Sequence, residues 1–225
     1  MARTRTLTNL LSDVRQRAGM ENSTFVTDSE LTEYINESAA EFRDLLIENE
    51  CSEFFMTSAT FSTSSGTAGY SLASDFYELH KVVIDLGGPQ NYSLKPYPAD
   101  EHGEAKSGSS WGWIAGGRLP RYRVVGSSLY FSPIPSGVFS VTYYYTPAQT
   151  RLSSGSDTVD GVNGWEEWIV IDSAIKCLAK EESDVSYLMA QREKIEQRIA
   201  RHAGRRDKSN GDRIRDVSRL TEPVV

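Results

Sequence analysis

Apolar side chains recur at helical spacing at the start of the chain. Between Leu7 and Ala18, leucine, valine and alanine side chains repeat every three or four residues. Thr6 stands before this stripe, where its hydroxyl can cap a helix, and Gly19 follows it, where glycine commonly ends one. We therefore predict a first helix between these two residues.

A second and longer stripe runs from Leu31 to Leu46. Thr27 and Glu30 have the spacing of a capping box, in which each side chain can bind the backbone N–H group of the other residue. Acidic residues near this start also suit the positive end of the helix dipole. The pattern predicts a helix over about residues 29–50.

Beyond residue 54 the pattern changes to segments rich in β-branched and aromatic residues. Clusters of glycine, proline, serine and asparagine separate these segments, which predicts a compact antiparallel β unit over about residues 57–147. VVGSSLYF is predicted to form two strands around a tight turn, and FSPIPSGVF a longer hairpin. Residues 96–120 are rich in glycine and serine and are predicted to form a long exposed loop.

Two tryptophans, Trp111 and Trp113, stand on this predicted loop. They either anchor the loop to the core or contact a partner, because aromatic residues are enriched at protein interfaces. Both interpretations stay open at the level of the sequence.

Helical spacing returns near the C-terminus. Asn163 can cap a helix there, with Glu166 three residues later. The apolar residues predicted to face the core from this helix are Trp168, Ile171, Ile175 and Leu178. Ser183 or Asp184 can cap a further helix, which Gly204 is expected to end. Its predicted apolar stripe contains Val185, Leu188, Met189, Ile195 and Ile199.

Together these patterns predict an α+β fold, with helical segments over residues 1–56 and 148–203 and an antiparallel β domain over residues 57–147. Residues 204–225 contain few apolar side chains, so we predict an extended C-terminal tail there.

The 225 residues carry a formal net charge of −7, which argues against a general binder of nucleic acids or membranes. Residues 192–225 contain ten Lys/Arg and six Asp/Glu, a net charge of +4, so the preceding 191 residues carry −11. This basic segment is either a solvated terminus or an arm that docks on a partner bearing carboxylates or phosphates. The side chains expected to make the docking contact are Arg201, Arg205, Arg206, Lys208, Arg213, Arg215 and Arg219.

No motif in the sequence supports catalysis. Ser173 and Lys176 have the Ser-x-x-Lys spacing of some acyl-transferring enzymes, but the Ser-Asp-Asn and Lys-Thr-Gly elements that accompany it are absent. Glu166 and Glu167 are adjacent, so a helix points them about 100° apart rather than at one substrate atom. Residues 156–167 imitate a calcium loop but lack an aspartate in the first position. We expect no catalytic residue, no metal site and no cofactor.

Three segments, taken in order, carry a further signal. They are FVTDSELTEYINESAAEFRDLL, FMTSATFSTSSGTAGYSLASDFYEL and SDTVDGVNGWEEWIVIDSAIKCLAKEESDVSYLMAQ. This succession of helix, β insertion and helix resembles the head-to-tail connector (adaptor) proteins of tailed bacteriophages, over about residues 25–203. The resemblance rests on the order of the segments and on their sequences, because the family has no catalytic signature motif.

The resemblance implies that the two helical segments form one bundle into which the β domain is inserted. It also implies a structural protein, about a dozen copies of which form a head-to-tail ring beneath the portal, as in short-tailed phages. It implies that the C-terminal segment reaches the portal protein, and that the lower face receives the tail nozzle protein. DNA would pass the acidic channel without sequence-specific binding. The expected location is the virion, with assembly in the host cytoplasm and no membrane association. The alternatives are a phage cell-wall (peptidoglycan) hydrolase and an intracellular nucleic-acid-binding protein.

Overall fold

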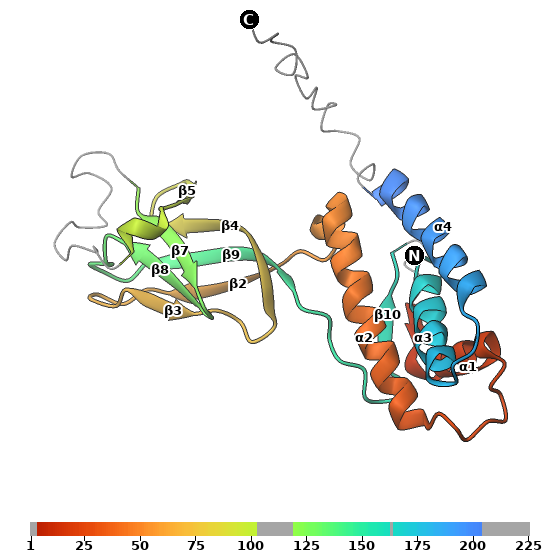
Figure 1. The fold of residues 1–225 in the computed structure, drawn as a ribbon. Helices are drawn as coiled ribbons and strands as arrows, with labels where there is room; N and C mark the ends of the chain where they lie inside the picture. The colour runs from red at the N-terminus through yellow and green to blue at the C-terminus, as the bar shows by residue number, and fades with distance from the viewer. Residues whose placement is uncertain (1–3, 103–118, 163, 204–225) are drawn as a thin grey trace, which may run out of the picture. The chain divides into compact units, whose positions relative to one another are not determined.

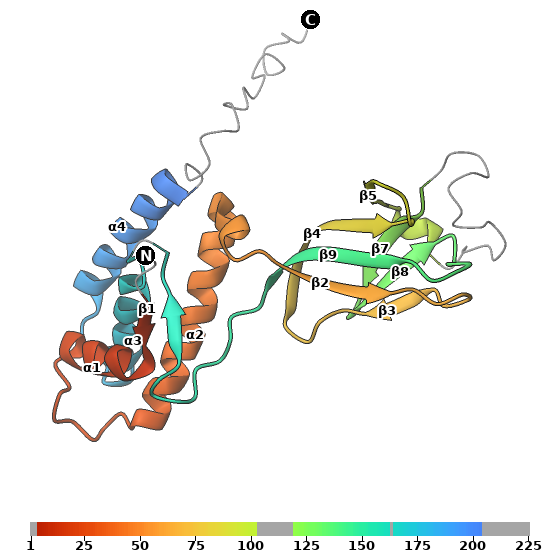
Figure 2. The ribbon, with the colours of Figure 1, turned by 180° about the vertical axis from the view of Figure 1, so that it is seen from behind.

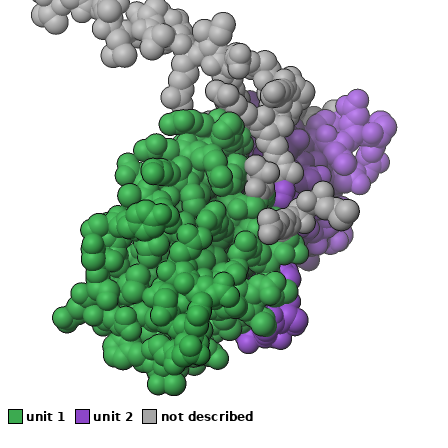
Figure 3. Space-filling model, turned by 90° about the vertical axis from the view of Figure 1, so that its right-hand side faces the viewer, with its two compact units in different colours: residues 1–51, 159–225 green, residues 52–158 purple. Residues whose placement is uncertain are grey.

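The computed structural model describes residues 4–102, 119–162 and 164–203. The chain divides into two compact units, residues 1–51 with 159–225 and residues 52–158 (Figure 3). We call these the helical unit and the β unit. The sequence pattern predicts domain boundaries after residues 56 and 147, and whether the parts on either side fold independently stays a prediction.

The helical unit is organised around one central helix. Its helices are α1 (Leu7–Ala18), α2 (Asp28–Leu46), α3 (Glu167–Lys180) and α4 (Ser186–His202). Helix α3 packs against each of the other three (Figures 1 and 2). A π-helical turn, η1 (Ile47–Cys51), continues α2, and a short 3₁₀ turn, η2 (Ser52–Phe54), leads into the β unit. Among the described residues, no helix combines the length and apolarity needed to cross a membrane.

The start signals of the first two helices and the end signal of the first are confirmed, while α2 ends at Leu46 and the rest of its predicted length is the π-helical turn. The Thr6 hydroxyl accepts a hydrogen bond from the Asn9 backbone N–H at 3.2 Å, and Gly19 ends α1 in the left-handed conformation with φ 69°. The Thr27 hydroxyl accepts from the Glu30 backbone N–H at 3.3 Å. These bonds satisfy N–H groups that a helix cannot satisfy internally.

Helix α3 differs from the one-sided stripe that its sequence predicts. Ile175 and Leu178 are only partly buried, whereas the polar side chain of Ser173 is completely buried. The reason is that α3 contacts three helices, α1, α2 and α4. Side chains in its first turns are therefore buried on every face, whereas a one-sided stripe assumes that one face is exposed to solvent. The predicted cap also differs, since α3 begins after Glu166 without a side-chain cap bond, and Asn163 lies outside the described residues.

Helix α4 follows its prediction more closely. Asp184, one of the two predicted caps, accepts hydrogen bonds from the backbone N–H of Ser186, at 2.9 Å, and from its hydroxyl, but the N-cap position itself belongs to Val185, which makes no side-chain cap bond. The stripe residues Leu188, Ile195 and Ile199 are buried. Met189, which was predicted to belong to this stripe, is instead 49% exposed. The expected stop at Gly204 lies outside the described residues.

A two-stranded sheet in the helical unit was not predicted. Strand β1 (Thr4–Thr6) pairs with β10 (Thr158–Asp160), which lies just before the residues that the sequence pattern predicts to form the third helix. Both strands have only three residues, too short to show a period of two. The pairing attaches the N-terminal strand beside the segment that leads into α3.

The β unit contains two four-stranded sheets that share one core. Their strand orders are β2-β9-β4-β5 and β3-β8-β7-β6. The first sheet contains β2 (Thr57–Ser62), β9 (Ser140–Pro147), β4 (Phe76–Asp85) and β5 (Asn91–Ser93). The second contains β3 (Gly69–Ser71), β8 (Ser128–Ser132), β7 (Arg121–Val125) and β6 (Lys95–Pro96). Val82 of β4, Tyr143 of β9 and Phe131 of β8 belong to the core cluster, so the sheets pack face to face.

The predicted tight turn between two strands is confirmed, and the longer hairpin is wrong. Strands β7 and β8 pair with Val125 opposite Ser128, and Gly126 turns the chain with φ 58°. The segment FSPIPSGVF instead connects two sheets, because β8 and β9 belong to different sheets. Local turn signals cannot distinguish a hairpin from a sheet-to-sheet connection, since both need the same turn residues.

Strand pairing in the β unit is antiparallel except for β6 with β7, which run parallel. A 3₁₀ turn, η3 (Ala99–Glu101), lies between these two strands. The mixture of helices with mainly antiparallel sheets agrees with the predicted α+β class. The bundle arrangement and the extended tail stay predictions.

Candidate functional site

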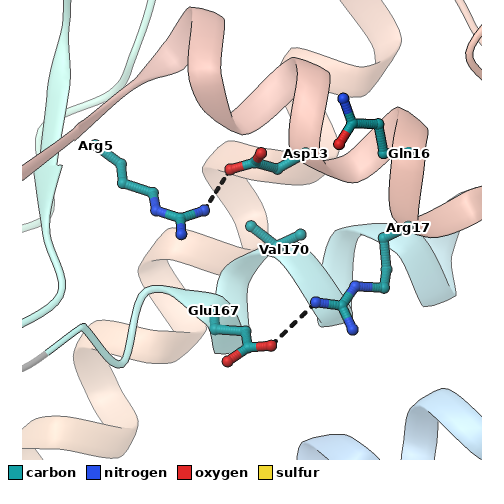
Figure 4. A pocket seen from close by; sticks show the side chains of 6 residues that line it. All are labelled: Arg5, Asp13, Gln16, Arg17, Glu167 and Val170. Atoms are coloured by element: carbon teal, nitrogen blue, oxygen red, sulfur yellow. Dashed lines mark hydrogen bonds and ion pairs between the residues drawn. The ribbon is translucent and has the colours of Figure 1, made fainter.

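The helical unit has a shallow depression of about 430 Å³ where β1, α1 and α3 meet (Figure 4). Its lining is mainly charged or polar and consists of Arg5, Asp13, Gln16, Arg17, Glu167 and Val170. Asp13, Gln16 and Arg17 come from α1, while Glu167 and Val170 come from the first turn of α3.

Ion pairs hold the charged side chains of this depression. Arg5 pairs with Asp13 through its terminal nitrogen. Its Nε atom lies 3.5 Å from a carboxylate oxygen of Glu166. Across the depression, Arg17 lies 3.0 Å from Glu167 (Figure 4). Arg17 also donates a hydrogen bond to Gln191. The depression therefore presents both signs of charge, already matched within the subunit, rather than a lone acid or base.

Glu166 is the most unusual carboxylate next to this depression. It is 1% exposed, and neither of its carboxylate oxygens accepts a hydrogen bond from another described residue. The ion pair with Arg5 compensates its charge without supplying a hydrogen bond. Gly161 packs directly against this side chain, so the turn before α3 is built around a buried charge.

A second buried carboxylate, Asp172, joins α3 to α2 and α4. It is 1% exposed and accepts a hydrogen bond from the Ser38 hydroxyl at 2.7 Å. Lys176 lies 3.3 Å from it, and Arg192 lies 2.5 Å from its other oxygen. Arg192 also lies over the ring of Trp168. Asp172 thus receives a neutral donor and two cations, which is the arrangement that a buried charge requires.

The structure argues against the Ser-x-x-Lys interpretation. Ser173 is completely buried, and its hydroxyl donates to the Ser38 hydroxyl at 3.2 Å. Burial lowers the pKa of Lys176, but hydrogen bonding to Glu41 and the charge of Asp172 outweigh this effect, so its pKa is raised overall. A lysine held protonated cannot take a proton from a serine nucleophile.

Replacing Ser173 with alanine is expected to lower the free energy of unfolding by about 1 kcal/mol, because one buried neutral hydrogen bond is lost. Ser38 keeps its own bond to Asp172 in the variant. Urea unfolding followed by circular dichroism measures the change. A loss above about 3 kcal/mol would show that the Asp172 network depends on this hydroxyl.

The two cysteines are free and buried. Burial raises the pKa of the Cys177 thiol to about 11, so little thiolate forms at neutral pH. We expect Ellman's reagent at pH 8 to modify the native protein slowly, and to modify two thiols at once after unfolding in urea. Rapid modification of the native protein would contradict the burial of both side chains.

The calcium-like segment does not gather its oxygen atoms around one point. Asp157 accepts hydrogen bonds from the backbone N–H groups of Ser153 and Ser154, and Asp160 accepts from that of Val162. No group of three or more metal-ligating side chains occurs within residues 4–102, 119–162 and 164–203. These carboxylates instead stabilise local turns.

The residues expected to bind a portal or a partner lie almost entirely outside the described part of the chain. Arg201 is exposed in the last turn of α4. The others fall in residues 103–118 or 204–225, and they are Trp111, Trp113, Arg205, Arg206, Lys208, Arg213, Arg215 and Arg219.

The two buried carboxylates were not singled out from the sequence as core charges. A signal for Asp172 existed, because it interrupts the apolar run Trp168–Ile171 and precedes Lys176 by four residues. Glu166 carried no such signal, since glutamate is common at the start of a helix.

A comparison with family models found a match to the family described as SU10 adaptor protein, over residues 5–221. No curated protein matches the chain. The family match covers the described residues of both units from Arg5 onwards.

Proposed function

Because the chain belongs to the SU10 adaptor protein family of phage head–tail adaptors, we propose that it forms the adaptor ring between the portal and the tail nozzle of a short-tailed phage. The family is structural rather than enzymatic, and it places the protein in the virion with the portal and tail components as its associates. The observation that carries the proposal is that the match extends over residues 5–221.

A ring of about a dozen copies needs two different surfaces on each subunit, because head-to-tail contacts are heterologous. The two units supply surfaces of different composition. The helical unit offers charged helices around a depression of matched ion pairs, and the β unit offers sheet faces rich in hydroxyl and aromatic groups. This difference supports head-to-tail contacts between subunits.

The distribution of charge supports both the channel and the portal contact. A charge of −11 over residues 1–191 suits a passage through which DNA moves without adhering. The basic C-terminal segment suits a docking arm for the portal, with Arg201 at the end of α4 as its first member.

The proposal is tested by mixing the protein with purified portal rings and measuring the mass of the product by native mass spectrometry. We expect one discrete complex, heavier than the portal by a whole number of adaptor subunits that matches the symmetry of the ring. A portal that keeps its own mass at saturating adaptor would contradict the proposal. Peptidoglycan zymography in parallel is expected to show no clearing, and clearing would support a cell-wall hydrolase.

A further inference from the structure

Strand β2 (Thr57–Ser62) is one of the two edge strands of its sheet. Within the described residues it pairs only with β9, through six consecutive residue pairs without a bulge. Alternate backbone N–H and C=O groups of β2 therefore point away from β9. An edge of this kind is a template on which a further strand can pair.

Strand β2 lacks the features that usually protect an edge. Its sequence TSATFS contains no charged residue, proline or glycine. The other edge strands of the two sheets are shorter: β6 is only the dipeptide Lys95–Pro96, and β3 and β5 have three residues each. Pairing with a further strand is limited at β6 by its lysine and proline, and at β3 and β5 by their short length. At six residues, β2 is the longest edge strand in the described part of the β unit and has none of these features.

We propose that β2 pairs antiparallel with β2 of a second copy of this chain, so that two sheets join across a two-fold axis. The inference concerns the free subunit and does not rest on the proposed ring. The partner at this edge is a second copy of the chain, because the sequence of β2 is complementary to itself when two strands run antiparallel. In a register centred on Thr60, Ser58 faces Ser62 of the second copy, and Ala59 faces its Phe61.

In this register, the core-facing side chains of one β2 strand lie beside the core-facing side chains of the other. Ala59 and Phe61 pack against the core of the β unit, whereas Ser58, Thr60 and Ser62 are exposed on the opposite face. In an antiparallel pair, directly opposite residues lie on the same face, so pairing about Thr60 joins core face to core face. It also places a small side chain, Ala59, opposite a large one, Phe61.

The exposed face would gain a row of hydroxyl groups. Thr60 already lies 2.9 Å from Thr142 through their hydroxyl oxygens. Pairing about the axis brings Thr60 of the second copy beside this pair, and threonine pairs across strands are favourable. Like charges never meet at this contact, because β2 carries none.

A contact of this type limits its own growth. It uses the same surface of both copies, so it closes after two subunits and cannot polymerise. The area of one strand edge is small, so the dimer is expected to be weak and to separate when larger contacts form. Such a dimer would shield the exposed edge before the protein assembles with its partners.

The first test compares Thr60→Lys with Val138→Lys by sedimentation velocity at increasing concentration. Val138 is 75% exposed in the connection between β8 and β9, so its variant controls for the added charge. The wild type and Val138→Lys are expected to dimerise, and Thr60→Lys to dimerise at least about tenfold more weakly, because two lysines would face each other. A monomeric wild type at about 100 µM would overturn the proposal.

The second test identifies the register. Oxidation of Thr60→Cys is expected to join two copies, because residues opposite each other at the axis lie within reach of a disulfide. Thr57→Cys is the matched control, since two Thr57 residues would lie about 20 Å apart in this register. The native cysteines are buried in the helical unit. Cross-linking of Thr57→Cys as fast as Thr60→Cys, with unchanged melting temperatures, would overturn the pairing.

Discussion

Replacing Gly161 with alanine is expected to destabilise the protein by at least about 3 kcal/mol. A Cβ atom on Gly161 would lie 2.1 Å from the Glu166 carboxylate and 2.4 Å from the Glu166 backbone nitrogen. The first contact could be relieved only by moving a completely buried side chain. The second could be relieved only by moving the backbone at the start of α3.

The turn around Gly161 has little freedom to relax. The Gly161 carbonyl accepts a hydrogen bond from the Trp165 backbone N–H at 3.2 Å. Val162 already has a positive φ of 57°, which is unfavourable for a β-branched residue. A shift of Glu166 would also move it away from Arg5, its only ion-pair partner in the described part of the chain.

Gly88→Ala is the matched control for this variant. A Cβ atom there would meet no other atom within 4 Å, so its stability should stay within about 0.5 kcal/mol of the wild type. Urea unfolding followed by circular dichroism compares the two variants. Equal stability of Gly161→Ala and Gly88→Ala would show that the turn before α3 adapts, and that Glu166 is not held in place by Gly161.

Removing residues 205–225 is expected to abolish binding to the portal while leaving the melting temperature almost unchanged. The deletion begins beyond α4, which ends at His202, and the described core lies outside it. The removed segment contains Arg205, Arg206, Lys208, Arg213, Arg215 and Arg219. If docking orders this segment, binding depends on many modest contacts, and losing them together removes most of the affinity.

Co-sedimentation with purified portal rings measures this effect. Neutralising Arg205, Arg206, Arg213 and Arg215 together should weaken binding far more than any single replacement, and raised salt should weaken it as well. A variant that deletes residues 205–225 and still binds like the full chain would exclude the tail from the contact. Attachment would then belong to the helices and sheets.

The sequence predicted best those features whose causes are local. Thr6 and Gly19 enclose α1 because capping depends on residues within one turn. The turn at Gly126 was predictable for the same reason. The connection from β8 to β9 was not, because the choice between one sheet and two depends on distant strands.

The candidate site was less predictable than the fold. Asp172 is stabilised by Ser38 and Arg192, which come from helices far from it in the sequence. The stripe predicted for α3 rests on the assumption that a helix has one buried face and one exposed face. This assumption fails for α3, because it has helical neighbours on three sides. Ser173 is completely buried, although it does not belong to the stripe predicted to face the core.

The helical unit is built from both ends of the chain, with residues 52–158 between them, and this order affects synthesis on the ribosome. Helix α2 is made early, but α3, which covers its apolar face, follows only after the whole β unit. At ordinary rates of translation this delay is on the order of ten seconds. During that time the β unit can fold, while Leu31, Ile35 and Phe42 lack the helix that covers them. A nascent chain whose β unit has left the ribosome while α3 is still inside the exit tunnel would thus carry an α2 without its partner helix, and such a chain is a substrate for chaperones.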